Sequence, residues 1–152
     1  MADLSPAFYD GKKQRTAGGG TLHAINPATG EAIGIFPRCG KPETDIAVQA
    51  AHRAFKSWRE MHPGERAKYL LKFADILETD RARLLAIDVR DNGSPIREMA
   101  IDLDVGTKHL RYYAGLALEV RGETIQTGHD RLDYTLRQPF GVVGSILPFN
   151  HP

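Results

Sequence analysis

The chain closes with TLRQPFGVVGSILPFNHP, residues 135–152, and this stretch decides the fold class. From Val142 to Leu147 it is apolar, rich in β-branched residues and interrupted by glycine. That pattern is typical of a strand buried on both faces, as in a parallel sheet. Such a strand needs neighbours on both sides. We therefore expect an α/β fold in which residues 139–152 are the first core strand of a sheet and the loop after it.

A hairpin is predicted immediately before that strand, over residues 123–138. Its second arm alternates apolar Leu132, Tyr134 and Leu136 with polar residues, and Gly128-His129-Asp130 supplies the turn. A hairpin with one apolar face needs a partner surface, either on its own subunit or on another one.

Four amphipathic helices are predicted between the first hairpin and this second one, because apolar residues recur there at helical spacing. The first is expected to take Thr44 or Asp45 as its N-cap. The other boundaries are Pro63, Asp80, Asn92-Gly93, Ser94-Pro95 and about Ala117. In the last helix, the spacing predicts a narrow seam with Gly106 as a point of close approach; its members are Met99, Leu103, Gly106, Leu110, Tyr113 and Ala117.

The amino-terminal part of the chain contains a further predicted hairpin. Pro27 and Gly30 separate two short alternating segments within residues 21–36. Residues 1–20 are expected to be a flexible arm, in which Gly18-Gly19-Gly20 is a connection and not a phosphate loop. Residues 21–122 then form one unit, a hairpin followed by four helices.

The amino-acid composition of the chain argues against several classes of function. The 152 residues carry 20 basic and 19 acidic side chains that are interspersed, so no basic stripe indicates a nucleic-acid partner. No stretch is long and apolar enough to span a membrane. The single Cys39 cannot form an internal disulfide and favours a cytoplasmic location. No pattern indicates a metal site.

Several motifs occur in the order found in one enzyme family. NPATGE at 26–31, DNGSP at 91–95, RYYAG at 111–115 and TLRQPFGVVGSILPFNHP at 135–152 resemble the amino-terminal part of NAD(P)-dependent aldehyde dehydrogenases. The resemblance runs from about residue 21 to the last residue. It implies an incomplete Rossmann-type cofactor domain, and it covers about a third of the family's length.

The resemblance also implies a chemistry. In the family, a cysteine thiolate attacks an aldehyde, the resulting anion passes hydride to NAD or NADP, and a glutamate activates the water that releases the carboxylic acid. An asparagine amide holds the anion, and Asn150 matches it here. Ile146, Leu147, Pro148 and Phe149 match residues that line the cofactor cleft. Without the motif, Asn150 would be interpreted as an Asx-turn residue and the other four as core packing.

The sequence differs from the family's pattern at two residues, and it lacks the family's nucleophilic cysteine and glutamate base. Phe149 replaces the commoner tryptophan and His151 the usual apolar or aromatic residue, which puts substrate preference in doubt; His151 is interpreted as a spacer or surface group. Cys39 lies far from the nucleophile's position and is interpreted as a bystander, and the family's glutamate base falls outside these residues. We therefore expect an amino-terminal fragment that is inactive alone.

Two functional classes remain open. The favoured one is an aldehyde dehydrogenase that acts on an aldehyde substrate, assembles as a dimer or tetramer through the hairpin at 123–138, and binds no nucleic acid or membrane. The alternative is a non-enzymatic helical assembly or interaction module derived from the same family.

Overall fold

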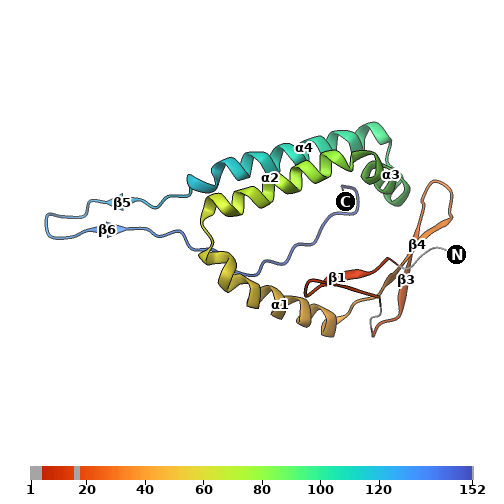
Figure 1. Ribbon diagram of the computed structural model, residues 1–152, viewed down its shortest axis with the longest axis horizontal. Helices are drawn as coiled ribbons and strands as arrows, with labels where there is room; N and C mark the ends of the chain where they lie inside the picture. Colours follow the sequence, from red (N-terminus) through yellow and green to blue (C-terminus); the bar gives the residue numbers. More distant parts are fainter. Residues whose placement is uncertain (1–4, 16–17, 152) are drawn as a thin grey trace.

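The structure is a computed structural model that describes residues 5–15 and 18–151. Its helices and strands form an open arrangement, in which a pair of long helices lies opposite a third helix and a thin hairpin projects from one end (Figure 1). In chain order the elements are β1 (Ala7–Tyr9), β2 (Lys12–Gln14), β3 (Thr21–Ile25), β4 (Ala32–Pro37), α1 (Lys41–Glu60), α2 (Pro63–Thr79), α3 (Arg81–Asn92), α4 (Ile96–Gly115), a 3-10 turn η1 (Leu116–Leu118), β5 (Thr124–Ile125) and β6 (Asp133–Tyr134).

The first hairpin, β1 with β2, was not expected from the sequence. Asp10 and Gly11 connect the two strands, and their φ angles are 53° and 70°. Two consecutive positive φ angles define a tight hairpin turn whose twist matches that of the strands. Asp10 also accepts a hydrogen bond from Arg53 of α1 at 3.0 Å. The prediction of a flexible arm over residues 1–20 is therefore wrong for residues 7–14.

The second hairpin, β3 with β4, confirms the predicted turn at Pro27 and Gly30. The backbone N–H of Gly30 donates to the carbonyl of Asn26 at 2.8 Å, and Gly30 has a φ of 73°. The Asn26 side chain accepts from the N–H of Ala28 at 2.9 Å, which is an Asx turn. The NPATGE motif thus folds as a hairpin tip.

Helix α1 begins earlier than predicted, with Gly40 as its N-cap instead of Thr44 or Asp45. Pro42 occupies the first turn, where its missing N–H costs nothing. The Glu43 carboxylate accepts from the N–H of Gly40 at 2.7 Å and from the N–H of Gly18 at 3.0 Å. These bonds satisfy amide groups at the helix start and tie the glycine triplet to it.

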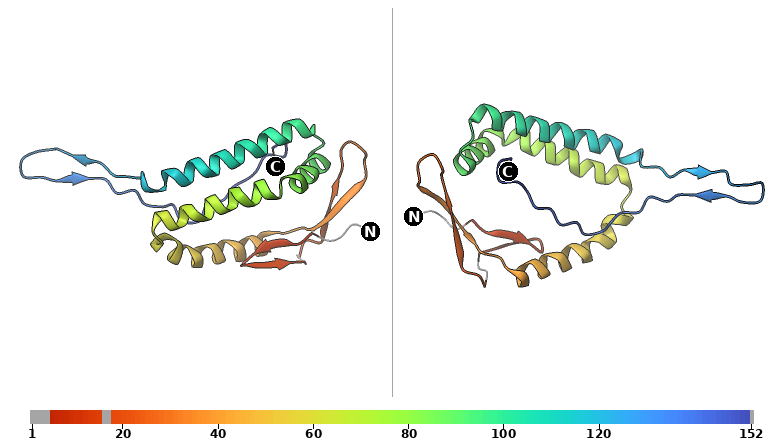
Figure 2. Two further views of the ribbon diagram at one scale, coloured as in Figure 1. Left: turned by 45° about the horizontal axis from the view of Figure 1, so that its top comes forward. Right: turned by 180° about the vertical axis from the view of Figure 1, so that it is seen from behind.

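The buried core of the described residues lies between α2, α3 and α4. Helices α2 and α4 pack side by side along most of their length, and α3 caps one end of the pair (Figure 2). Across this pair, Arg111 donates to Asp75 at 2.8 Å and to Glu78 at 2.7 Å. The buried side chains of these three helices are Ala74, Leu85, Met99, Thr107 and Ala114.

The boundaries of these three helices match the predictions, and all of the predicted α4 seam except Tyr113 is buried or partly buried. Helix α2 begins at Pro63, and α3 ends at Gly93, whose φ of 74° is the left-handed cap expected there. On α4, Met99, Thr107 and Ala114 are buried, whereas Tyr113 of the predicted seam is mostly exposed. A Cβ on Gly106 would meet no atom of residues 5–15 or 18–151 within 4 Å, so no described element makes the predicted close approach at Gly106.

The third hairpin, β5 with β6, is shorter than the predicted range 123–138, with two residues in each strand. The pairing continues at Glu123, whose carbonyl accepts from the N–H of Thr135 at 2.9 Å. Leu132, Tyr134 and Leu136 are all exposed. Within the described residues, this apolar face therefore contacts no surface that buries it.

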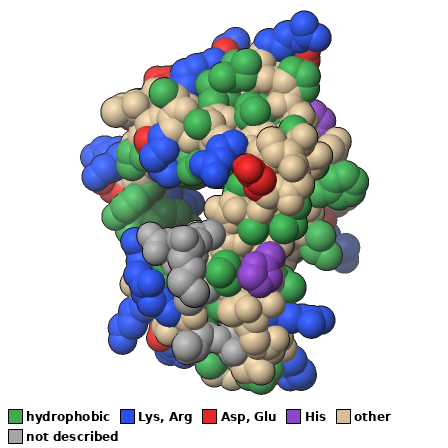
Figure 3. All heavy atoms as spheres, turned by 90° about the vertical axis from the view of Figure 1, so that its right-hand side faces the viewer, with side chains coloured by type: hydrophobic (Ala, Val, Ile, Leu, Met, Phe, Trp, Pro, Cys, Tyr) green, Lys and Arg blue, Asp and Glu red, His purple; other side chains and the backbone are tan. Residues whose placement is uncertain are grey.

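The predicted core strand from Val142 to Leu147 is not formed. Residues 139–151 run as an extended segment between α1 and the α2–α4 pair, and no strand of the described chain pairs with them (Figure 1). A strand is held by ladder hydrogen bonds to a neighbour, so an apolar sequence alone does not produce one. Exposed apolar side chains also occur elsewhere, interspersed with lysine and arginine on the face shown in Figure 3.

Candidate functional site

The candidate site is the end of the C-terminal segment, residues 146–151. Phe149 and Asn150 form a turn there. The side chains of this stretch lie in solvent: Ile146 is fully exposed and Phe149 is 91% exposed. Leu147 and Pro148 are exposed as well. The structure therefore keeps the predicted residues together in one short stretch, but it does not assemble them into a closed cleft.

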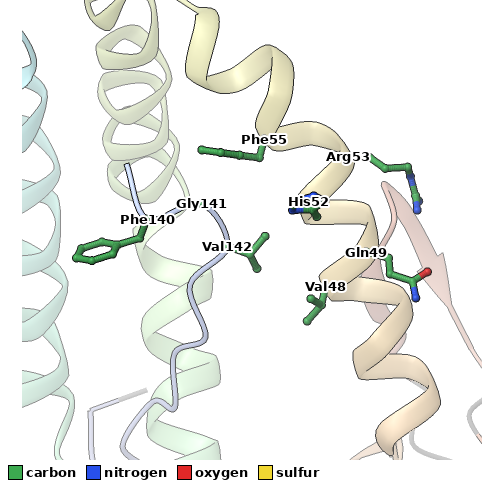
Figure 4. A pocket seen from close by; sticks show the side chains of 8 residues that line it. All are labelled: Val48, Gln49, His52, Arg53, Phe55, Phe140, Gly141 and Val142. Carbon is green, nitrogen blue, oxygen red and sulfur yellow. The ribbon is translucent and has the colours of Figure 1, made fainter. Parts of the chain in front are cut away.

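The start of the segment lies against α1. Val48, His52 and Phe55 of α1 and residues Phe140, Gly141 and Val142 of the segment line an open pocket of about 470 Å³. Phe55 points from α1 toward the segment, while Phe140 points away from α1 (Figure 4). Gly141 has a φ of 99°, and a Cβ added to it would lie 3.7 Å from the Phe55 ring. The apolar stripe predicted on α1 thus faces this segment, although no residue of α1 is buried.

The end of the segment is fastened to α4. The Nδ1 atom of His151 lies 2.6 Å from the Oδ2 atom of Asp102. Both residues line a hollow of about 430 Å³ among α2, α3 and α4. Its other lining residues are Leu77, Leu84, Asp88, Met99, Leu103, Val105, Gly106 and His109.

The electrostatics of this hollow are acidic. Partial burial raises the pKa of Asp88 above its ordinary value, and the nearby carboxylates of Asp91 and Asp102 raise it further. An acid beside other carboxylates resists ionisation, so Asp88 holds its proton to a higher pH than a free aspartate does. The hollow therefore favours groups that donate hydrogen bonds, as the ring of His151 can.

Asn150 is free to act on a ligand. Its side chain is exposed and forms no hydrogen bond with the described residues. An Asx turn would require a backbone N–H two residues later, at Pro152, and proline has none. The sequence thus excludes that interpretation of Asn150. A neutral amide donor that nothing occupies can stabilise a developing negative charge on a substrate oxygen.

The residues predicted to contact the cofactor would fit only part of a dinucleotide. Ile146, Leu147, Pro148 and Phe149 offer apolar surface suited to the rings of NAD or NADP, but the stretch carries no charged side chain for the pyrophosphate. Cys39 lies exposed between β4 and α1. In residues 5–15 and 18–151, no group of three or more His, Cys, Asp or Glu side chains could hold a metal ion, and no described helix is long and apolar enough to cross a membrane.

Sequence comparisons identify the family. A family model described as the aldehyde dehydrogenase family matches residues 14–152. An aldehyde dehydrogenase of Aspergillus niger is 38% identical over 146 residues, which make up 95% of this chain and 29% of that protein. The mitochondrial aldehyde dehydrogenase of Homo sapiens is 41% identical over 136 residues, 87% of this chain and 26% of that protein. The chain belongs to the aldehyde dehydrogenase family.

Solved structures agree with this assignment. An aldehyde dehydrogenase from Bacillus cereus superimposes with a TM-score of 0.93 at 36% identity, covering 99% of this chain and 31% of that one. An NAD+ complex of the aldehyde dehydrogenase from the same organism gives a TM-score of 0.82 at 34% identity, covering 87% of this chain and 28% of that one. The expected α/β class is therefore confirmed. The chain spans less than a third of the length of these relatives.

The contact between His151 and Asp102 is the feature of the site that the sequence did not predict. The two residues are 49 positions apart, so no local pattern connects them. The available signal was chemical: a histidine stands where the family usually has an apolar or aromatic residue, and a polar replacement in an apolar position needs a partner.

Proposed function

We propose that this chain is the amino-terminal part of an NAD(P)-dependent aldehyde dehydrogenase that converts an aldehyde to a carboxylic acid. The observation that supports this most directly is the family match, which continues through the stretch Pro148-Phe149-Asn150. The catalytic cysteine and glutamate then belong to sequence that the chain does not include. Cys39 takes no part, since it precedes Asn150 in the chain, whereas the family's nucleophile follows the asparagine.

In this proposal Asn150 forms half of an oxyanion hole. When the nucleophile attacks the aldehyde, the carbonyl oxygen becomes negatively charged, and the Asn150 amide donates a hydrogen bond to it. Because the amide is neutral, it stabilises that charge without a proton to lose. Such a donor placed in advance at the developing charge is worth about 2.7–4 kcal/mol in other enzymes.

Ile146, Leu147, Pro148 and Phe149 are proposed to contact the cofactor's apolar surface. NAD or NADP supplies the hydride acceptor when bound. The four side chains would orient it and exclude water from the reacting atoms, which is consistent with their present exposure. Ligands in open α/β sheets bind at the carboxyl ends of strands, where this stretch would lie once the sheet is complete.

The proposal extends to assembly and location. The hairpin of residues 123–138 presents Leu132, Tyr134 and Leu136 to solvent, and this apolar face supports a dimer or tetramer in the intact enzyme. The single, unpaired Cys39 supports the cytoplasm as the place of action.

The test begins with the reading frame downstream of the Pro152 codon. We expect it to encode a long α/β segment with the cysteine and the glutamate in their family context. In the enzyme it encodes, Asn150→Ala should lower kcat by about 10²–10³-fold. Asn26→Ala, which removes an asparagine from the β3–β4 turn, is the matched control and should leave kcat unchanged. A stop codon directly after Pro152, or an Asn150→Ala enzyme with normal kcat, would overturn the proposal, and the former would favour a non-enzymatic assembly module.

A further inference from the structure

The starting observation is how little holds the loop that carries Asn150. Among the described residues, the bond between His151 Nδ1 and Asp102 Oδ2 is the one hydrogen bond that joins residues 139–151 to the rest of the chain. The other end of the segment lies against α1, where Phe140, Gly141 and Val142 line a pocket together with Phe55. The position of Asn150 therefore depends on the residue directly after it.

We propose that the His151–Asp102 pair is a latch that positions the amide of Asn150, which makes His151 and Asp102 positioning residues for the reaction. The proposal rests on the function proposed above for Asn150. Helix α4 packs along α2 and buries Met99, Thr107 and Ala114, so Asp102 stands on a packed helix. A mobile loop anchored to that support loses much of the freedom that would otherwise displace the adjacent amide.

The chemistry of the pair fixes the histidine ring. A carboxylate only accepts hydrogen bonds, so the proton between the two atoms belongs to His151 Nδ1. The neutral ring is then held in its Nδ1–H tautomer, which leaves the Nε2 lone pair free. Carboxylates orient histidines in this way in many active sites. Asp88 from α3 and His109 from α4 are the other titratable groups that line the hollow containing the pair.

The exposure of the pair limits the size of the effect. The side chains of His151 and Asp102 are 59% and 40% exposed. Water competes for such a bond, and exposed pairs change an equilibrium by at most about fivefold. The latch is thus expected to tune the placement of Asn150 and not to decide whether the chain folds.

The contact itself is tested in the 152-residue chain by nitrogen NMR of the histidine rings in mildly alkaline solution. We expect His151 to show a protonated Nδ1 and an unprotonated Nε2. Asp102→Ala should return the ring to the Nε2–H form that free histidine favours, while His23, exposed on β3, keeps its signals. A His151 ring in the Nε2–H form in the unchanged chain would overturn the latch.

The consequence is tested by steady-state kinetics in the enzyme encoded by the extended reading frame. His151→Leu and Asp102→Ala should each lower kcat by up to about fivefold with KM nearly unchanged, and the double variant should lose no more than either one. His151→Asn, whose amide can replace Nδ1–H, should restore most of the loss. His23→Leu is the matched control.

Combination with Asn150→Ala separates a latch from a general structural role. If His151 acts through Asn150, then His151→Leu should cost nothing further once Asn150 is alanine. Additive losses would overturn the latch. If Asn150→Ala alone lowers kcat while His151→Leu and Asp102→Ala do not, the latch fails and the proposed function stands; if Asn150→Ala has no effect, the proposed function itself fails.

Discussion

The α2–α4 pair and residues 139–151 are both rich in apolar side chains, yet they differ in burial. On α2 and α4, Ala74, Met99 and Ala114 are buried, because these two helices pack against each other within the chain. In the C-terminal segment, Val143, Ile146 and Phe149 remain exposed, because no strand of the described residues lies beside them. An apolar sequence thus indicates that a segment packs against another apolar surface in the intact protein. The segment is buried only when that partner surface is present.

The largest expected effect compares one leucine from each region. Leu85 of α3 is 8% exposed and Leu147 is 73% exposed. Leu85→Ala should lower the free energy of unfolding by about 2–5 kcal/mol, since it leaves a cavity in a small core. Leu147→Ala should change it by less than about 0.5 kcal/mol. Urea denaturation followed by circular dichroism measures both, and Leu85→Met, costing less than about 1.5 kcal/mol, is the control for volume. Equal losses at the two leucines would contradict the comparison.

A smaller effect is expected at two glycines of the helical region, where substitution by alanine should change the free energy of unfolding in opposite directions. Gly93 has a φ of 74°, and a Cβ there would lie 2.6 Å from Pro27 Cγ, so Gly93→Ala should cost more than about 1 kcal/mol. Gly106 lies inside α4 with open space around it. Gly106→Ala should therefore stabilise the chain by about 0.5–1 kcal/mol through helix propensity. Thermal unfolding distinguishes the two, and a destabilised Gly106→Ala would show that α4 is approached there after all.

The smallest effects concern pH. Hydrogen bonds from the N–H groups of Gly18 and Gly40 lower the pKa of Glu43, so its ionised form stabilises the fold above the ordinary glutamate pKa and this stabilisation is lost as pH falls. Burial raises the pKa of Asp88, so stability falls as pH rises from the ordinary aspartate pKa through the raised value.

The opposite pKa shifts of Glu43 and Asp88 predict opposite changes in stability when each residue is replaced by its amide. At neutral pH, Glu43→Gln should lower the melting temperature and Asp88→Asn should raise it. The Asp88→Asn difference should shrink as pH falls below the ordinary aspartate pKa of about 3.9, and the Glu43→Gln difference as pH falls through the lowered pKa of Glu43. Melting curves at neutral and acidic pH provide the measurement. Shifts of the same sign in both variants would contradict these assignments.

Local signals predicted the elements whose causes are local. Pro63 marked the start of α2, Gly93 the end of α3, and Pro27 with Gly30 the tip of the β3–β4 hairpin. The start of α1 was missed because the helix is capped at Gly40, whose N–H donates to the Glu43 carboxylate. Thr44 and Asp45 are commoner N-cap residue types, but here they lie inside the helix. The β1–β2 hairpin was missed although Asp10-Gly11 is a strong turn signal.

The site was predictable only in part, for a different physical reason. The motif singles out Asn150 and its neighbours as candidate site residues, and these lie in one stretch because they are consecutive in sequence. The contact from His151 to Asp102 depends on how α4 lies relative to a distant loop, and periodicity carries no such information. The missing strand shows the same limit, since pairing of Val142 to Leu147 requires a neighbour that is not among the described residues.

Amide hydrogen exchange, read by mass spectrometry, tests the central claim most directly. The claim is that residues 142–150 have the sequence of a buried strand and loop but lack the sheet that would bury them. In the 152-residue chain, we expect these amides to exchange nearly as fast as in an unfolded peptide, while the amides of α2 and α4 are protected. In the enzyme encoded by the extended reading frame, residues 142–147 should become as protected as those helices. Equal protection of residues 142–147 in both proteins would contradict the account.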